Sequence, residues 1–217
     1  MDKVLYVISG LGADYRVFKN LDLNDWTLIH LKWMKPEKDE KIEDYAQRMA
    51  AFITHPDPII LGLSFGGMMA IEISKIITTR HVILVSSVKT FKELPPFIAA
   101  AGKLGLHKFA VKPFFKPGAP MLYQVMGVSL PEDKKLLDDI IADADMAFYN
   151  WAIDKIVYWK NEVVPGNLTH IHGKNDKLMG SKYIHDFNGV DEGGHLMVLN
   201  KPKEVGEIIL STLKALC

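Results

Sequence analysis

The residues best suited to chemistry surround Ser64, in the sequence GLSFGG at residues 62–67. An apolar run at 59–63 leads into Ser64, and apolar residues at helical spacing follow it. In a sharp turn from a buried strand to a helix, a serine hydroxyl stands free and side chains two positions away would clash. We therefore predict Ser64 as a nucleophile and Gly62, Gly66 and Gly67 as glycines that the turn requires. The alternative is a structural or phosphate-binding glycine turn, although GxGxxG and P-loop fingerprints are absent.

A base and an acid that could activate Ser64 lie further along the chain. His195 ends the sequence EGGH, after a weak apolar run at 187–190 and before the last helical pattern. Asp176 lies a few residues beyond the apolar run at 168–172. Both are expected at the carboxyl edge of a parallel sheet, where Ser64 also emerges. The order nucleophile, acid, base along the chain fits a Ser-His-Asp triad.

Other polar residues compete for these roles. His170 and His172 stand two apart on a predicted strand and could be metal ligands. No third ligand is evident nearby, so we interpret them as hydrogen-bonded strand histidines and predict no metal site. Asp191 and Glu192 lie too near His195 along the chain to align its ring easily. For Asp176 itself, the alternative is an ordinary turn-forming aspartate.

Acyl transfer also needs backbone donors for the developing oxyanion. The first candidate is the N–H of Phe65, directly after the nucleophile. The second is the N–H of Leu11, in the loop SGLG at residues 9–12 that follows the first apolar run. A plain glycine turn is the alternative for this loop.

Short apolar runs alternate with helical patterns along most of the chain. Strand patterns occupy residues 4–8, 27–31, 59–63, 81–86, 168–172 and 187–190, and the first five of these runs indicate burial on both faces. Helical patterns occupy 42–53, 66–77 and 203–216. This alternation predicts an α/β fold, with a mostly parallel sheet covered by helices on both faces.

The stretch 93–162 lacks a strand pattern and breaks this alternation. A capping box at residues 129–132 predicts a helix through 141, and residues 145–159 predict another. Within a single domain spanning 1–217, the stretch is interpreted either as a long crossover or as a helical lid over the sheet edge. Lid residues that could line a substrate pocket, or form the lid's own core, are Phe114, Phe115, Met121, Tyr123 and Met126.

The composition limits the classes of partner that we expect the protein to bind. Basic and acidic residues balance at 26 each, so no net field favours nucleic acid or an anionic membrane. The single cysteine excludes an internal disulfide and a cysteine zinc cluster. With neither a signal-peptide pattern nor a bilayer-length apolar run, we expect a cytoplasmic protein that acts on a small, uncharged molecule.

Together these motifs resemble the α/β-hydrolase superfamily, particularly small bacterial members that open with a stretch like GLGADYRVF at residues 10–18. The resemblance covers nearly the whole chain and implies a cap between the sixth and seventh family strands. It also implies ester or related acyl hydrolysis without a cofactor. The chain departs from the family at Ser9, where many members carry histidine, and in the short stretch from Asp176 to His195.

The first functional hypothesis is therefore a carboxylesterase-like serine hydrolase that forms an acyl-enzyme. The second is a non-catalytic protein that has kept the pocket for ligand binding, although such a protein has no need of a complete triad. The third is a lyase or transferase that uses the same nucleophile. Thioester, lactone, amide and C–C bonds remain open as targets, since the fold alone does not decide among them.

Overall fold

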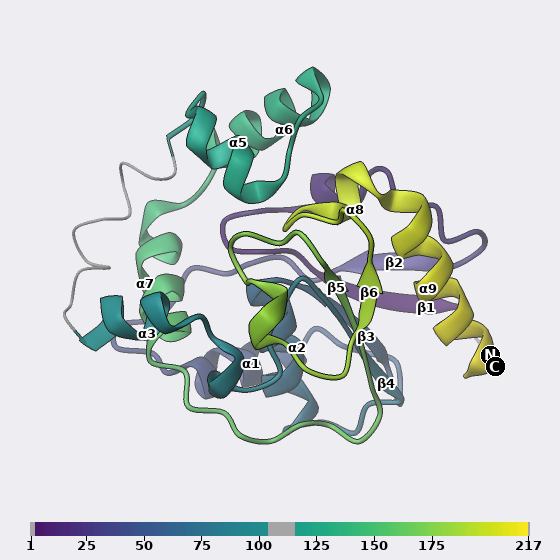
Figure 1. Cartoon of the computed structure of the whole chain (residues 1–217). Coiled ribbons are helices and arrows are strands. Elements are labelled where there is room, and N and C mark those ends of the chain that lie inside the picture. The colour runs from purple at the N-terminus through teal and green to yellow at the C-terminus, as the bar shows by residue number, and fades with distance from the viewer. Residues whose placement is uncertain (1–2, 104–115, 217) are drawn as a thin grey trace.

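A parallel sheet forms the centre of the molecule. The computed structural model describes residues 3–103 and 116–216, and within them six parallel strands lie in the order β2-β1-β3-β4-β5-β6 (Figure 1). The strands are β1 (Val4–Ile8), β2 (Thr27–His30), β3 (Ile59–Leu63), β4 (His81–Val85), β5 (Leu168–Gly173) and β6 (Asn188–Val190). The predicted α/β fold class is confirmed, and each predicted strand is present within two residues of its expected bounds.

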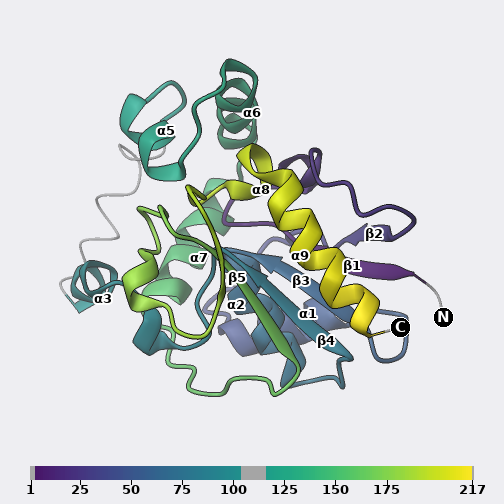
Figure 2. The ribbon, with the colours of Figure 1, turned by 45° about the vertical axis from the view of Figure 1, so that its right-hand side comes forward.

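Helices cover both faces of the sheet (Figure 2). On one face lie α1 (Ile42–Ala50) and α2 (Phe65–Ser74), and on the other lie α8 (Met197–Asn200) and α9 (Pro202–Ala215). Short 3-10 helices are η1 (Tyr15–Phe18), η2 (Phe91–Glu93) and η3 (Ser181–Tyr183). None of the helices within residues 3–103 and 116–216 is both long and apolar enough to cross a bilayer.

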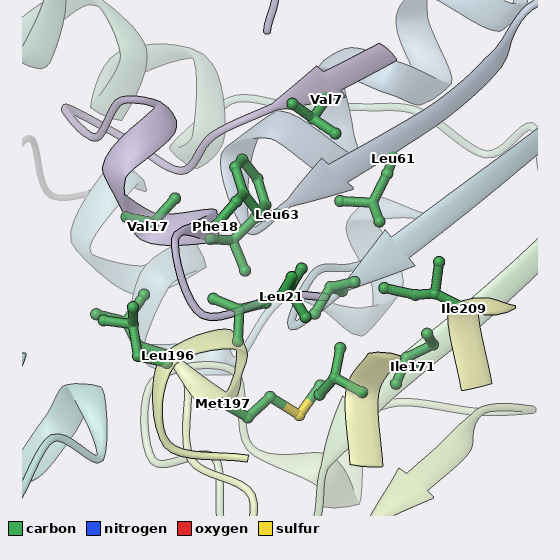
Figure 3. Packing of buried hydrophobic residues seen from close by; sticks show 14 of the residues in the cluster. Val7, Val17, Phe18, Leu21, Leu61, Leu63, Ile171, Leu196, Met197 and Ile209 are labelled. Atoms are coloured by element: carbon green, nitrogen blue, oxygen red, sulfur yellow. The ribbon is translucent and has the colours of Figure 1, made fainter. Parts of the chain in front are cut away.

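Strand side chains alternate between two hydrophobic cores. Leu5 and Val7 of β1 point to the α8–α9 side, whereas Tyr6 and Ile8 pack with α1 and α2. Figure 3 shows the first core, where strand residues meet Met197 of α8. Burial on both faces explains why the central strands are continuously apolar instead of alternating.

The edge strand β2 differs from this prediction. Its residues are exposed or half-buried, and Leu28 is 37% exposed, so the expectation that it is buried on both faces is wrong. The reason is position: β2 pairs with β1 alone and has solvent on its other side.

In the described part of the chain, four α-helices lie between β4 and β5: α3 (Pro96–Lys103), α5 (Pro120–Met126), α6 (Pro131–Ala142) and α7 (Met146–Val157). We call them the inserted helices. Buried side chains of α5 and α6 join the core on the α8–α9 side, whereas those of α7 join the core around α1 and α2. The inserted helices therefore extend both cores of the sheet domain.

The start of α6 corrects one prediction. The expected capping box is wrong, because Leu130 is the N-cap and no side chain caps the helix. Pro131 takes the first helical position, where its missing N–H costs nothing, and this places Ser129 outside the helix. By contrast, α7 has a side-chain cap, since Asp145 accepts from the N–H groups of Ala147 and Phe148.

Candidate active site

The site lies where the strand order reverses. From β1 the chain passes to β2 on one side and then to β3 on the other. Loops that leave neighbouring strands at such a point diverge and open a crevice at their carboxyl ends. The loop after β1 and the turn after β3 meet here: a Cβ added at Gly10 would lie 3.5 Å from Cβ of Ser64.

Ser64 occupies the predicted strand-to-helix turn, with backbone angles of φ 53° and ψ −119°. A positive φ is strained for a residue with a Cβ, and it lifts the hydroxyl out of the turn. A Cβ at Gly62 would overlap the carbonyl of Gly66, and a Cβ at Gly66 would overlap the end of β1. A Cβ at Gly67 would overlap Ser87. Close backbone approach therefore leaves no room for a side chain at Gly62 and Gly66, and the side chain of Ser87 leaves none at Gly67.

The structure brings the three residues of the predicted triad together. Nε2 of His195 lies 2.9 Å from Oγ of Ser64, and Nδ1 of His195 lies 2.8 Å from Oδ2 of Asp176. Because the carboxylate accepts from Nδ1–H, Nε2 is left to accept the serine proton. All three side chains are buried. The two competing carboxylates lie elsewhere: Asp191 pairs with Lys174 and Glu192 with Lys201.

The carboxylate of Asp176 is held in place from two sides. Its Oδ1 accepts from the N–H groups of Leu178 and Met179, each at 2.8 Å, and its Oδ2 accepts from His195. Burial acts to raise the pKa of this carboxyl, but the charge and hydrogen bond of His195 outweigh it, helped by His172 and Met179. The pKa therefore lies below its ordinary value, and the group is ionised at neutral pH.

The two strand histidines have protein partners. Nε2 of His170 donates to the carbonyl of Ser87 at 3.1 Å, and Nε2 of His172 donates to the carbonyl of Met179 at 2.7 Å. Burial lowers the pKa of both rings, that of His170 to about 3, so both are neutral at pH 7. Among residues 3–103 and 116–216, no group of three potential ligand side chains could hold a metal ion.

His172 also supports the site in a way that sequence reasoning missed. Its Nε2 lies 3.5 Å from Oδ2 of Asp176, the atom that His195 also contacts. A second missed support is Ser87, whose hydroxyl donates to the carbonyl of Ser64 at 2.7 Å. The contact of Ser87 joins segments that are distant in the chain, and that of His172 depends on the path of the loop after β5; a single sequence specifies neither.

The two predicted oxyanion donors belong to segments beside the nucleophile. Phe65 is the first residue of α2, so its N–H belongs to the first turn, where no intrahelical acceptor exists. Leu11 lines the cavity beside Ser64 and His195. The helix N-terminus adds a partial positive charge at this point, which favours a developing negative charge.

Side chains from neighbouring segments hold the loop that carries Leu11. The hydroxyl of Ser9 donates to the carbonyl of Ala13 at 2.6 Å, and it lies 3.3 Å from Nε2 of His30. The indole of Trp33 donates to the carbonyl of Gly10 at 3.1 Å. The hydroxyl of Ser9 thus links the start of its own loop to the end of it.

A cavity of about 250 Å³ extends from Ser64 and His195. Of the five predicted pocket residues, Met126 lines it, but Met121 and Tyr123 are not among the described lining residues. Met121 is 54% exposed, and the hydroxyl of Tyr123 donates to a carboxylate of α6. Phe114 and Phe115 lie outside the described residues. Seven of the described lining residues lie on α6 and α7, whose packing on the sheet the sequence could not place.

Comparison with known proteins finds similar structures but no similar sequence. No family model matches the chain, and no curated protein matches it either. A thermophilic esterase from Thermogutta terrifontis superposes with a TM-score of 0.73 at 15% identity, covering 98% of this chain and 90% of that one. A lipase-esterase related protein from Clostridium acetobutylicum gives 0.66 at 18% identity, covering 96% and 93%. MenH from S. aureus gives 0.68 at 15% identity, covering 100% and 95%. The chain therefore has the α/β-hydrolase fold.

Proposed function

We propose that the protein is a serine hydrolase that cleaves an ester or a related acyl bond. Ser64 is the nucleophile, His195 the general base and Asp176 the orienting acid. The observation that carries the proposal is the unbroken hydrogen-bond chain from Oγ of Ser64 through the imidazole to the carboxylate. This order of contacts is the one needed to activate a serine at neutral pH.

In the first half of the reaction, Nε2 of His195 takes the proton of Ser64 while Oγ attacks the acyl carbon. The carbonyl oxygen becomes an oxyanion, which the N–H groups of Leu11 and Phe65 stabilise. The imidazolium then gives its proton to the leaving group as the tetrahedral intermediate collapses. Asp176, ionised because its pKa is lowered, keeps the imidazole in the reactive tautomer and stabilises its cation.

In the second half, water attacks the acyl-enzyme. His195 takes a proton from the water, and the same two N–H groups stabilise the second oxyanion. Collapse of this intermediate returns the proton to Oγ of Ser64 and releases the acid. Both halves use one set of groups, so no metal or organic cofactor enters the proposed mechanism.

The character of the cavity supports an acyl substrate. Nearly all the side chains that line it are apolar, and the nucleophile lies at its wall. The esterase from Thermogutta terrifontis, which shares the fold, has a name that is consistent with this chemistry. Transfer of the acyl group to an acceptor other than water would use the same groups, and product analysis separates it from hydrolysis.

Labelling with a fluorophosphonate probe and hydrolysis of p-nitrophenyl acetate test the proposal. We expect the wild-type protein to be labelled at Ser64 and to hydrolyse the ester. Ser64→Ala and His195→Ala should each lower kcat by about 10³-fold or more, with little further loss in the double variant, because the residues act as a unit. Wild-type activity in purified Ser64→Ala protein would show that another group is the nucleophile.

A further inference from the structure

The cavity beside Ser64 is built almost entirely of aliphatic side chains. Its wall on α6 is formed by Leu137, Ile140 and Ile141, and its wall on α7 includes Ile153 and Ile156. Leu178 and Leu196 close it on the side of His195. Apart from Ser64 and His195, Tyr149 is the one described lining residue whose side chain carries a polar atom.

The described part of this wall carries no charged side chain. None of the described lining residues is Asp, Glu, Lys or Arg. An ionised group placed in the cavity would therefore lose its hydration without gaining a partner, which costs several kcal/mol for a buried charge. The part of a substrate that occupies the cavity is expected to be neutral and apolar.

Size limits the length of that part. The cavity measures about 250 Å³. An apolar cavity of about 150 Å³ binds benzene, which has six carbons, so this one has room for an acyl chain on the order of eight carbons. A much longer chain would have to leave the cavity, and each carbon beyond its end would gain little from burial.

Given the proposed function, on which this inference rests, we propose that the site takes esters of neutral, medium-length aliphatic acids. The acyl chain lies in the cavity between α6 and α7, and its carbonyl carbon lies at Oγ of Ser64. Specificity for chain length then comes from the inserted helices, whereas the chemistry comes from the sheet.

A series of p-nitrophenyl esters from acetate to palmitate, with one leaving group throughout, tests chain length. We expect kcat/KM to rise about threefold to fourfold per added methylene up to hexanoate or octanoate, and to fall by dodecanoate. The monoester of suberic acid, which matches octanoate in length but ends in a carboxylate, should be at least about tenfold poorer than octanoate. Equal values across the series, or equal values for octanoate and the suberate monoester, would overturn the proposal.

Substitutions of cavity-lining residues test whether the acyl chain of the substrate lies in the cavity. Ile141→Trp and Ile153→Trp fill the cavity from partly exposed positions on two different helices. Each should lower kcat/KM for octanoate about tenfold, while the value for acetate changes less than about twofold. The matched control is Leu136→Trp, also partly exposed on α6 but not a described lining residue. An unchanged chain-length profile in both lining variants would place the acyl chain elsewhere.

The same experiment separates failure of this inference from failure of the proposed function. If acetate is hydrolysed in a Ser64-dependent reaction but chain length has no effect, the hydrolase assignment stands and the chain assignment falls. If no ester in the series is hydrolysed and the fluorophosphonate does not label Ser64, the proposed function itself falls.

Discussion

At Ser64 the protein holds a residue in a conformation that an isolated chain would avoid. A non-glycine residue at φ 53° costs on the order of 1–3 kcal/mol, so the surroundings must hold it there. The N–H of Ser64 donates to Val85, and the carbonyl of Ser64 accepts from Ser87. The last residue of β4, Val85, and the nearby Ser87 thus hold both ends of the residue.

Asp176 offers a test of the acid's role that leaves the fold intact. An asparagine keeps the shape of the side chain but loses the charge that holds His195 in the reactive tautomer. We expect Asp176→Asn to lower kcat by about 10³-fold to 10⁴-fold with a small change in KM. Steady-state kinetics, with circular dichroism to confirm folding, measure the effect. A loss below about tenfold would mean that the carboxylate is only a turn residue.

The sequence was enough to propose the three residues of the triad, but not the contacts that hold them. Ser64 and His195 stand in glycine-containing motifs next to predicted strands, and these local signals are strong. His172 and Trp33 act on the site through contacts between segments that are distant in the chain. Such contacts depend on strand register and loop path, for which the sequence carries no local signal.

At the scale of elements, the inserted helices contact the loop that carries His195. The N–H of Leu196 donates to the carbonyl of Met126 at 2.9 Å, and the side-chain amide of Asn200 donates to the carbonyl of Gly127. Gly127 and Gly194 approach so closely that a Cβ on either would lie 2.8 Å from the other's Cα. The end of α5 therefore sets the position of this loop.

Two glycines on either side of α5, Gly118 before it and Gly127 at its C-cap, allow the effect of this contact to be separated from that of backbone strain. Gly127 and Gly118 both have positive φ, 71° and 80°, but a Cβ at Gly118 meets nothing within 4 Å. Gly127→Ala should push the loop of His195 and lower kcat on the order of tenfold to a hundredfold. Gly118→Ala should carry only the backbone strain and leave kcat within about twofold of wild type.

Initial rates and thermal unfolding of both glycine variants measure the difference. Equal effects of the two substitutions on kcat would show that α5 does not position His195. If Gly127→Ala lowers thermal stability but not kcat, α5 likewise does not position His195. The contact would then contribute only to the stability of the fold.

For the molecule as a whole, hydrophobic periodicity was enough to predict the class of fold. Strands buried on both faces and amphipathic helices each leave a local pattern, and their alternation implies a parallel sheet. Periodicity did not show that Leu28 is exposed, because burial depends on whether a strand lies at the sheet's edge. It also did not reveal the cavity, whose walls come from α6 and α7 as well as the sheet.

The buried histidines make the free energy of unfolding depend on pH. Burial, with a smaller effect from the charges of His172 and Lys89, lowers the pKa of His170 to about 3 in the folded protein. In the unfolded chain the pKa of histidine is about 6.5. Between these values the unfolded state binds more protons, so the free energy of unfolding falls as the pH falls.

Replacing His170 should reduce the fall in the free energy of unfolding at acidic pH. In His170→Gln, whose amide can still donate to Ser87, the free energy of unfolding should fall less steeply below about pH 6.5, by up to about 1.4 kcal/mol per pH unit. Urea unfolding from about pH 7 to about pH 4 measures the slope. The control is His185→Gln, the same change of residue type at an exposed position. Parallel curves for wild type and His170→Gln would mean that His170 binds protons alike in both states, so its burial would not be a source of acid sensitivity.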